Sequence, residues 1–288
     1  MNATQLLQAI LDGLATGALY ALVALSFSLV WATVRTVDLA LLQIIAVAGM
    51  VAYWVGSAGV VPALLASIAV SVALAVLSHY IAIRPTRAKG QIYPVIASLG
   101  LGLLILGAAS LIFGVNLHTM PPLIPGGGLH IGSLYIAWTS SAVLCITFAL
   151  LASAAIAMKV SKLGLAFRAT AAEPQLAEAY GIGVRSVLLG SAASAGVGIG
   201  LAGPLGAVQG GSVSPFFGAT MGLMGIVAML LGGAGNPAGA VVGGLLVGII
   251  QSVASQYLSG SMGEVASYSL LLLVMVARPS GLMKGSMA

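Results

Sequence analysis

Charged side chains are scarce in this chain of 288 residues. Ten Lys or Arg and five Asp or Glu make up 5% of the sequence, whereas 60% of its residues are hydrophobic. An average soluble domain is about 25% charged, so this chain lacks the polar groups that would cover a soluble surface. Disordered proteins combine low hydrophobicity with high charge and are excluded too. The composition therefore predicts a protein embedded in a membrane.

Several motifs of enzymes and metalloproteins are also missing. The sequence has no G-x-x-x-x-G-K-[ST] phosphate loop, no H-E-x-x-H motif, no cysteine pair and no G-x-S-x-G nucleophile elbow. Its one cysteine, Cys145, cannot form an internal disulfide. We therefore predict that the chain is not an enzyme, has no catalytic residues and itself holds neither a metal nor a cofactor.

Long apolar runs dominate the rest of the sequence. They are about 20 residues long, the length of a helix that crosses a bilayer, whereas the strands of a membrane barrel would give segments of about ten residues with alternating polarity. We predict one all-α domain over residues 1–288, a polytopic helical membrane protein with about eight or nine spans. The expected spans are Leu11–Trp31, Leu39–Val55, Val61–Ile83, Tyr93–Phe113, Leu134–Met158, Val187–Val208, Phe217–Leu231, Ala240–Leu258 and Val265–Ala277.

The basic residues determine the predicted orientation. Short loops rich in Lys and Arg stay in the cytoplasm, so we expect the N-terminus outside and the C-terminus inside, in a cell inner (plasma) membrane. The same clustering argues against nucleic acid as a partner, despite the net charge of +5. The glycine-rich segments 210–215 and 232–239 are predicted to break the spans and could be re-entrant, and no convincing internal repeat is visible. The basic groups are Arg84, Arg87 and Lys89, then Lys159, Lys162, Arg168 and Arg185, then Arg278 and Lys284.

The acidic residues bear on the source of energy. Asp12, Asp38, Glu173, Glu178 and Glu264 all fall near predicted span ends or in loops. A transporter coupled to protons or sodium commonly carries ionisable residues deep in the membrane, so this placement favours another subunit as the source of energy. The alternative is a stand-alone secondary transporter or channel for a small organic solute.

The most informative segment is the charged stretch 159–185. Lys159–Ala172 is predicted to continue the fifth span as a helix beyond the membrane. Glu173 and Pro174 suit the start of a short helix, because proline fits its first position and a carboxylate favours the positive end of the helix dipole. Gly181 suits a left-handed residue after its end. The short helix is predicted on the cytoplasmic face, either as a plain connector or as a surface that a partner grips.

Several short motifs occur together in an order and spacing that carry a family resemblance. They are Asp12-Gly13-Leu14 with Gly17, Tyr20-Ala21-Leu22, Arg84-Pro85 with Arg87, Ile96 to Gly100, Ser161 to Gly164 with Arg168-Ala169, Ala171 to Pro174 with Ala177 to Ala179, Gly181-Ile182, the glycines between Gly232 and Gly244, and Arg278-Pro279 with Gly281-Leu282. Over nearly its whole length the chain resembles permeases of ATP-binding-cassette (ABC) importers, in particular the LivH-type permease of branched-chain amino acid transporters.

The resemblance implies a permease subunit that moves a small amino acid-like or organic-acid solute into the cytoplasm, with a branched-chain or other hydrophobic amino acid favoured. Its partners would be two ABC ATPase subunits that carry ATP and magnesium, a second, non-identical permease subunit and a periplasmic substrate-binding protein. Segment 159–185 would be the coupling segment that contacts an ATPase subunit. The resemblance assigns this contact to Arg168, Glu173, Ala177, Glu178, Gly181 and Ile182.

Residues 38–43 depart from the family pattern. Many members carry an Asn-hydrophobic-Ala-His-Gly-acid pattern at the start of the second span, whereas this chain has Asp-Leu-Ala-Leu-Leu-Gln there. If this segment lines the solute path, the path is more apolar than usual, and a hydrophobic amino acid, an aromatic carboxylate or another apolar organic acid becomes the expected solute. Alternatively, the pattern is structural and the leucines make a smoother helix.

The glycine-rich segment 232–237 is a second candidate for the path. Irregular backbone at membrane depth is tolerated where it is buried in protein or lines water, and helix ends could present N–H groups to an anionic solute. A close-packed glycine turn is the alternative. The predicted path residues are Asp38, Leu41, Leu42, Gln43, Gly232, Gly233 and Asn236.

Overall fold

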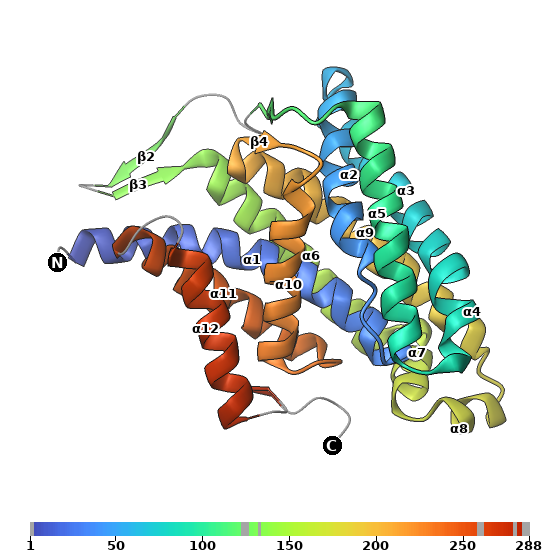
Figure 1. Cartoon of the computed structure of the whole chain (residues 1–288). Helices are drawn as coiled ribbons and strands as arrows, with labels where there is room; N and C mark the ends of the chain where they lie inside the picture. The colour runs from blue at the N-terminus through green and yellow to red at the C-terminus, as the bar shows by residue number, and fades with distance from the viewer. Residues whose placement is uncertain (1–2, 122–126, 132–133, 258–261, 279–280, 284–288) are drawn as a thin grey trace.

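The computed structural model describes residues 3–121, 127–131, 134–257, 262–278 and 281–283, and most of them are helical (Figure 1). The main helices are α1 (Ala3–Val34), α2 (Ala40–Val55), α3 (Val60–Ser78), α5 (Ile92–Phe113), α6 (Trp138–Val160), α9 (Val184–Gly210), α10 (Phe217–Gly232), α11 (Pro237–Tyr257) and α12 (Met262–Ala277). Within the described ranges, seven helices are long and apolar enough to cross a membrane, and α10 and α12 are shorter apolar helices. The prediction of an all-α polytopic membrane protein is confirmed.

Short elements connect these helices. Helix α3 continues through a π-helical turn, and two short helices separate α6 from α9. Two small antiparallel pairings, β1 with β4 and β2 with β3, lie at the end of the molecule opposite α7 and α8 (Figure 1). The connecting elements are η1 (Gly56–Ala58), η2 (His79–Ile83), α4 (Arg84–Thr86), η3 (Arg87–Lys89), β1 (His118–Thr119), β2 (Gly128–Ile131), β3 (Leu134–Ala137), α7 (Lys162–Ala172), α8 (Pro174–Ala179) and β4 (Ser212–Val213).

Two predicted helix boundaries are wrong. Residues 134–137 were expected to open the fifth span, but they form strand β3, in which Ala137 lies opposite Gly128 of β2. The predicted helical continuation of Lys159–Ala172 is also interrupted. Ser161 is extended, with φ −79° and ψ 150°, and its hydroxyl accepts a hydrogen bond of 2.9 Å from the Gly164 N–H. This cap starts α7 as a separate helix, because serine at that position satisfies a free N–H group of the first turn.

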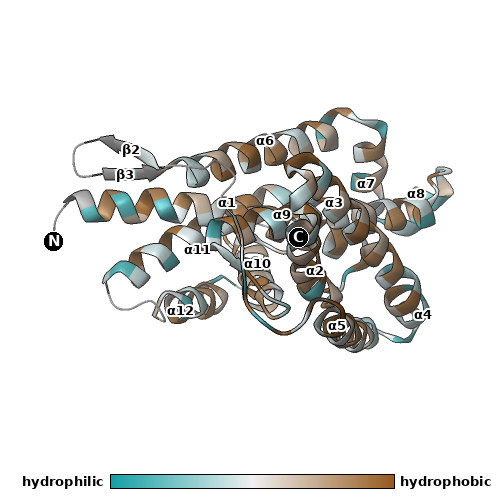
Figure 2. Cartoon of the chain, turned by 90° about the horizontal axis from the view of Figure 1, so that it is seen from above, coloured by the Kyte–Doolittle hydropathy of each residue, from teal (hydrophilic) through white to brown (hydrophobic). Residues whose placement is uncertain are grey.

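The interior is formed by α1, α2, α9 and α10, while α3, α5 and α6 expose most of their apolar surface. Seen from above, α5, α6 and α12 lie on the outside of the molecule (Figure 2). Fully buried side chains such as Phe27 and Leu41 fill the centre. Exposed leucines on the outer helices suit a hydrocarbon surrounding, since a bilayer is as apolar as those side chains.

Two sets of helices share one packing pattern. Helix α1 packs along α11, and α9 packs along α3, in the two most extensive helix contacts of the described chain. In both contacts small residues repeat every four positions: Gly244 and Gly248 on α11 approach α1, and Gly196 and Gly200 on α9 approach α3. A Cβ atom at either glycine of α9 would lie 2.7 Å from a Cα atom of α3, so only glycine allows this separation.

Helices α1 and α9 run in opposite directions. The turn after α1 contacts Ala171 at the end of α7, which precedes α8 and α9, whereas β4, which follows α9, pairs with β1 at the other end. Helices α2 and α10 follow α1 and α9 and contact each other. The α9–α3 contact is therefore inverted relative to the α1–α11 contact, and we name the two contacts the inverted pair. Inverted repeats that move against each other are known from transporters.

The turns divide between two ends of the molecule. One end, here named the α8 end, carries the turn 35–39, α4, α7, α8, the turn 233–236 and the described C-terminal residues (Figure 1). Its contacts include the N–H of Leu282 bonded to the carbonyl of Leu231 at 2.9 Å. The opposite end carries the four strands. The structure thus agrees with the predicted alternation of the nine apolar segments.

Candidate coupling and transport site

Helix α8 protrudes from the α8 end of the molecule (Figure 1). It begins as predicted, with Glu173 extended at φ −149° and Pro174 at the first helical position. Proline is suited to this position because the missing N–H would have no partner within the helix. The new helix therefore starts with only Glu173 between it and the end of α7.

The end of α8 is a Schellman motif. The Gly181 N–H bonds to the Glu178 carbonyl and the Ile182 N–H to the Ala177 carbonyl, both at 3.0 Å. Gly181 has φ +80°, so the predicted left-handed glycine is confirmed. These bonds satisfy carbonyl groups that the short helix would otherwise leave free, and they fix the direction in which the chain enters α9.

The outer face of α8 is apolar at its centre. Leu176 is 59% exposed and Tyr180 is 85% exposed, while Ala177 is buried. Leu176 and Tyr180 are four residues apart and share one side of the chain turn. Glu173 and Glu178 are exposed as well. Our sequence reasoning overlooked Leu176 and Tyr180, although an apolar pair at helical spacing in a segment outside the membrane was a visible signal.

Arg168 lies one helix earlier than the other predicted coupling residues. Its guanidinium donates a hydrogen bond to the carbonyl of Met158, near the end of α6. The structure therefore groups five of the six predicted residues in α8 and its flanking residues, and it places Arg168 where it holds α7 against α6.

Arg35 connects this segment to the turn between α1 and α2. Its guanidinium donates a hydrogen bond of 3.2 Å to the carbonyl of Ala171, in the last turn of α7. Arg35 is the only non-glycine residue of the described chain with positive φ, at +61°, and its N–H bonds to the Trp31 carbonyl at 2.8 Å. A cation at this carbonyl end is favoured by the helix dipole.

Asp38 is buried beneath the same turn, with 2% of its surface exposed. Its carboxylate accepts hydrogen bonds of 2.9 and 3.0 Å from the Ser78 hydroxyl and of 3.1 Å from the Ala40 N–H. Burial raises the pKa of Asp38 to about 6, against the opposing effect of these hydrogen bonds. Asp38 thus joins the start of α2 to the end of α3.

The predicted path residues that follow Asp38 lie in the helix core. Leu41 is fully buried, and Leu42 packs against Gly218 and Gly222 of α10. Gln43 is half-buried, and its Oε1 atom is buried without a hydrogen-bond partner. The two leucines favour the structural alternative for this segment, while Gln43 retains an unused polar atom between α2 and its neighbours.

The predicted break in the glycine-rich segment is confirmed, since α10 ends at Gly232 and α11 starts at Pro237. Gly232 packs directly on the backbone of Gly239. The Asn236 carbonyl oxygen Oδ1 accepts bonds from the N–H groups of Ala238 at 3.1 Å and Gly239 at 3.2 Å. Asn236 therefore caps α11, and Gly233, at φ +113°, turns the chain. This placement favours the close-packed turn among the two alternatives.

A cavity of about 560 Å³ lies between α1, α6, α7 and α9. Its wall is mainly apolar, with hydroxyl groups from several helices. The predicted path residues do not line it. Its serines are Ser26, Ser153, Ser161, Ser186, Ser191 and Ser194.

Exposed side chains follow one side of α10, here named the open face of α10, and Figure 2 shows α5 and α12 on either side of this helix. Phe216, which directly precedes α10, is exposed, and so are Thr220 and Leu223 on α10, at helical spacing. Apolar side chains of α5 and α12, such as Leu104 and Leu272, are exposed on the flanking helices. This face contains a hydroxyl group within an otherwise apolar stripe.

No group of three His, Cys, Asp or Glu side chains that could hold a metal ion occurs among the described residues. The crossing helices, the inverted pair of helix sets and the protruding α8 define a polytopic membrane protein of the transporter type.

Residues 9–277 match the family described as "Branched-chain amino acid transport system / permease component", and the chain belongs to this family. The resemblance predicted from the motifs is thereby confirmed. The chain is 25% identical over 297 residues to the high-affinity branched-chain amino acid transport system permease protein BraD of Pseudomonas aeruginosa. It is 26% identical over 295 residues to the permease protein LivH of the corresponding system in Escherichia coli. Each alignment covers 96% of this chain and 95% of the relative.

One solved structure has a similar fold. PsaBC from Streptococcus pneumoniae in complex with Fab aligns with a TM-score of 0.51 and 17% sequence identity. The alignment covers 93% of this chain and 90% of that chain. At this identity the likeness concerns the fold alone.

Proposed function

We propose that the chain is the permease subunit of an ABC importer that moves a small amino acid-like or organic-acid solute into the cytoplasm. A branched-chain or other hydrophobic amino acid is the favoured solute, in line with the names of the relatives BraD and LivH. The observation that carries this proposal is α8, a capped and exposed helix at one end of a chain that belongs to a permease family. Two separate ATPase subunits, which hold ATP and magnesium, would supply the energy.

In this proposal α8 is the coupling helix. Leu176 and Tyr180 enter a groove of the ATPase subunit, and Glu173 and Glu178 contact its rim. Ala177 packs inward and keeps α8 close to the body of the permease, and the cap formed by Gly181 and Ile182 makes α8 and the start of α9 move together.

The contacts around α8 provide routes for its motion. Arg168 ties α7 to α6, and Arg35 ties α7 to the turn between α1 and α2. The interior helices α1 and α9 belong to opposite members of the inverted pair. A displacement of α8 would therefore reach both halves of the permease and could reorient them between outward and inward states.

We propose that the solute path follows the open face of α10 and is completed by a second, non-identical permease subunit. The apolar stripe with Thr220 between α5 and α12 supports this position, because a hydroxyl group is suited to a path more than to lipid. Gln43, with its unpartnered Oε1, and Asp38 would then lie near the end of the path. Leu41, Leu42, Gly232, Gly233 and Asn236 would support its walls by packing.

The α8 end would face the cytoplasm of a cell inner membrane, which leaves the N-terminus outside and the C-terminus inside. The basic residues support this orientation, because Arg84, Arg87 and Arg185 lie at the α8 end. A periplasmic substrate-binding protein would deliver the solute at the opposite end.

The test is reconstitution in vesicles with radiolabelled leucine, with and without the ATPase subunits and the binding protein. We expect uptake that requires all components and stops when ATP is omitted. Uptake by the permease alone would overturn the proposal and identify a stand-alone secondary transporter or channel.

A further inference from the structure

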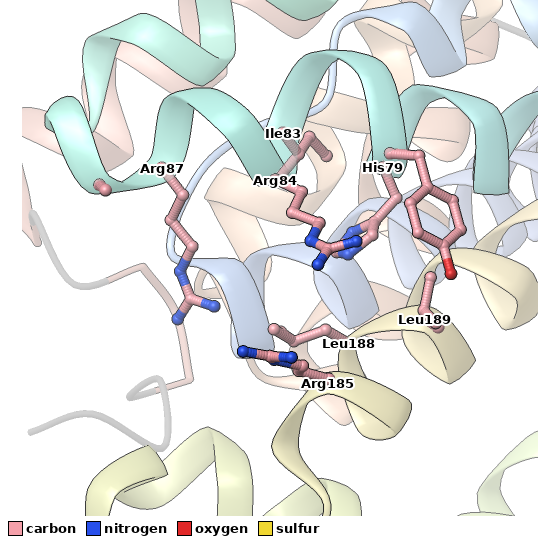
Figure 3. Close-up of a pocket in the computed structure, with 9 residues that line it drawn as sticks. His79, Ile83, Arg84, Arg87, Arg185, Leu188 and Leu189 are labelled. Atoms are coloured by element: carbon pink, nitrogen blue, oxygen red, sulfur yellow. The ribbon is translucent and has the colours of Figure 1, made fainter.

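A basic cavity of about 590 Å³ lies between the end of α3 and the start of α9 (Figure 3). Arg84 and Arg87 extend from the α4 region toward α9, where Arg185 lies. Arg185 is 101 positions from Arg84 and 98 from Arg87 in the sequence, and only the packing of α9 against α3 brings them together.

Among the described residues, the three guanidinium groups have no carboxylate partner. No described Asp or Glu lines this cavity or forms an ion pair with Arg84, Arg87 or Arg185. Arg84 lies over the ring of Tyr80, at 5.7 Å from its centroid. Three like charges around one cavity repel each other, so an anion between them would relieve the repulsion and accept their hydrogen bonds.

A buried histidine forms part of the wall of this cavity. His79 lines the cavity, is 5% exposed, and its Nδ1 atom is buried without a hydrogen-bond partner. Buried polar atoms in folded proteins are nearly always paired. The Nδ1 atom is closed off from the cavity, so His79 contributes a polar side chain to its wall, and the contacts with an anion are left to the three guanidinium groups.

The wall of the cavity and the surface beside it are apolar, as a lipid-binding site requires. Tyr80, Leu188 and Leu189 contribute apolar surface to its wall. Leu77, in the last turn of α3, is 42% exposed, and Ile81, in η2, is 56% exposed, four residues further on the same side. An acyl chain could lie on this face while its headgroup occupies the cavity.

We infer that this cavity binds the phosphate headgroup of an anionic phospholipid such as phosphatidylglycerol. Basic pockets between membrane helices bind such headgroups because guanidinium groups form paired hydrogen bonds with phosphate oxygens at the membrane edge. The site differs from the proposed coupling helix α8, which lies farther from the strands than α4 does (Figure 1). The inference depends on the membrane location and not on the proposed transport direction or solute.

The test measures lipid binding to the purified full chain in detergent by native mass spectrometry, with phosphatidylglycerol and with the neutral phosphatidylcholine. We expect the triple variant Arg84→Gln/Arg87→Gln/Arg185→Gln to lose about 100-fold in affinity for phosphatidylglycerol, since each basic side chain near an anionic surface contributes roughly fivefold. Phosphatidylcholine binding should not change.

The matched control removes the same charge elsewhere, with Lys159→Gln/Lys162→Gln/Arg278→Gln, all exposed at the α8 end. It should retain phosphatidylglycerol as the wild type does. Equal losses in both triple variants would mean a general charge effect and would overturn the assignment. Unchanged binding in the first triple variant would overturn it as well.

Two further arms separate the source of the phosphate and guard against misfolding. Inorganic phosphate should neither raise the melting temperature as phosphatidylglycerol does nor compete with it. An equal effect that depends on the same arginines would assign the cavity to free phosphate instead. Arg84→Lys/Arg185→Lys keeps the charge but not the paired hydrogen bonds, and it should retain partial binding. If the first triple variant lost a partner ATPase but not the lipid, the surface would belong to the protein interface.

Discussion

The guanidinium of Arg35 donates a hydrogen bond of 3.2 Å to the carbonyl of Ala171 across 136 positions of the chain. This bond joins the turn after α1, the most buried spanning helix, to the last turn before α8. The proposed coupling segment is therefore attached to the interior of the permease by a hydrogen bond as well as by the peptide chain.

The variant Arg35→Gly tests whether this hydrogen bond contributes to transport rather than to stability. Arg35→Gly removes the hydrogen bond but also relieves a left-handed conformation that costs a side chain about 1 kcal/mol. We expect a melting temperature close to that of the wild type and a several-fold loss of ATP-driven uptake in reconstituted vesicles. Lys89→Gln, which removes an exposed cation outside segment 159–185, serves as the control and should transport normally. Normal uptake by Arg35→Gly would reject a role in coupling.

The cap of α8 depends on the backbone conformation of Gly181. A side chain here would meet open space, so the cost of substitution is backbone strain alone, about 1–2 kcal/mol. Gly181→Val should reduce coupled uptake while membrane insertion stays intact. Gly181→Asn is the matched control, because asparagine tolerates the left-handed region, and it should transport better than Gly181→Val. Equal activity of the two variants would contradict the importance of the cap.

Charge reversal tests the rim of α8. Glu178 is exposed and its side chain has no packing role in the described structure, so Glu178→Arg should leave the melting temperature within a few degrees of wild type. We expect it to reduce coupled uptake by interfering with the ATPase contact. Unchanged uptake would remove Glu178 from the proposed interface.

The contact between α1 and α11 predicts opposite results for two glycines. A Cβ atom at Gly244 would overlap the backbone of Ala21, whereas one at Gly107 of α5 would meet nothing within 4 Å. Gly244→Ala should destabilise the protein by about 1–3 kcal/mol, seen as a lower melting temperature in detergent. Gly107→Ala should leave the melting temperature unchanged or slightly higher. Equal effects would contradict the close approach of the two helices.

Asp38 predicts a dependence of stability on pH. Its pKa in the folded protein is about 6, above the ordinary value of 3.8, so the folded state holds this proton more tightly than the unfolded state does. The stabilisation from the protonated carboxyl is complete below pH 3.8 and is lost as the pH rises to about 6. The difference is on the order of 3 kcal/mol.

Asp38→Asn removes this titration and keeps an oxygen that can accept from Ser78 and Ala40. We expect the variant to be at least as stable as the wild type at pH 7.5 and to show a smaller change in melting temperature between pH 4 and 7.5. A variant that melts well below the wild type at pH 7.5 would show that the charged carboxylate is needed.

Local features of the fold were predictable because single residues encode them. Pro174 and Gly181 define the ends of α8, and the glycines after Leu231 end α10. The strand Leu134–Ala137 was not predicted because its apolar residues run directly into those of α6. No glycine or proline between them marks the end of the strand. The capping hydroxyl of Ser161, which separates α6 from α7, was a signal that could have been used.

The inverted pair was invisible in the sequence for a different reason. Gly244 and Gly248 of α11 correspond in position to Ser67 and Ser71 of α3, so small size is shared but residue identity is not. The burial of Asp38 and the meeting of Arg185 with Arg84 depend on tertiary packing, which no local pattern reports.

The central claim is that α8 is the surface on which an ATPase subunit acts. The most direct measurement is cross-linking from single cysteines in a Cys145→Ser background, with a photoreactive maleimide at Leu176→Cys and, as control, at Leu117→Cys, which is exposed near the strands. We expect the ATPase subunit to be captured from position 176 only. Capture from position 117, or labelling of position 176 by an impermeant reagent added outside the cell, would contradict the account.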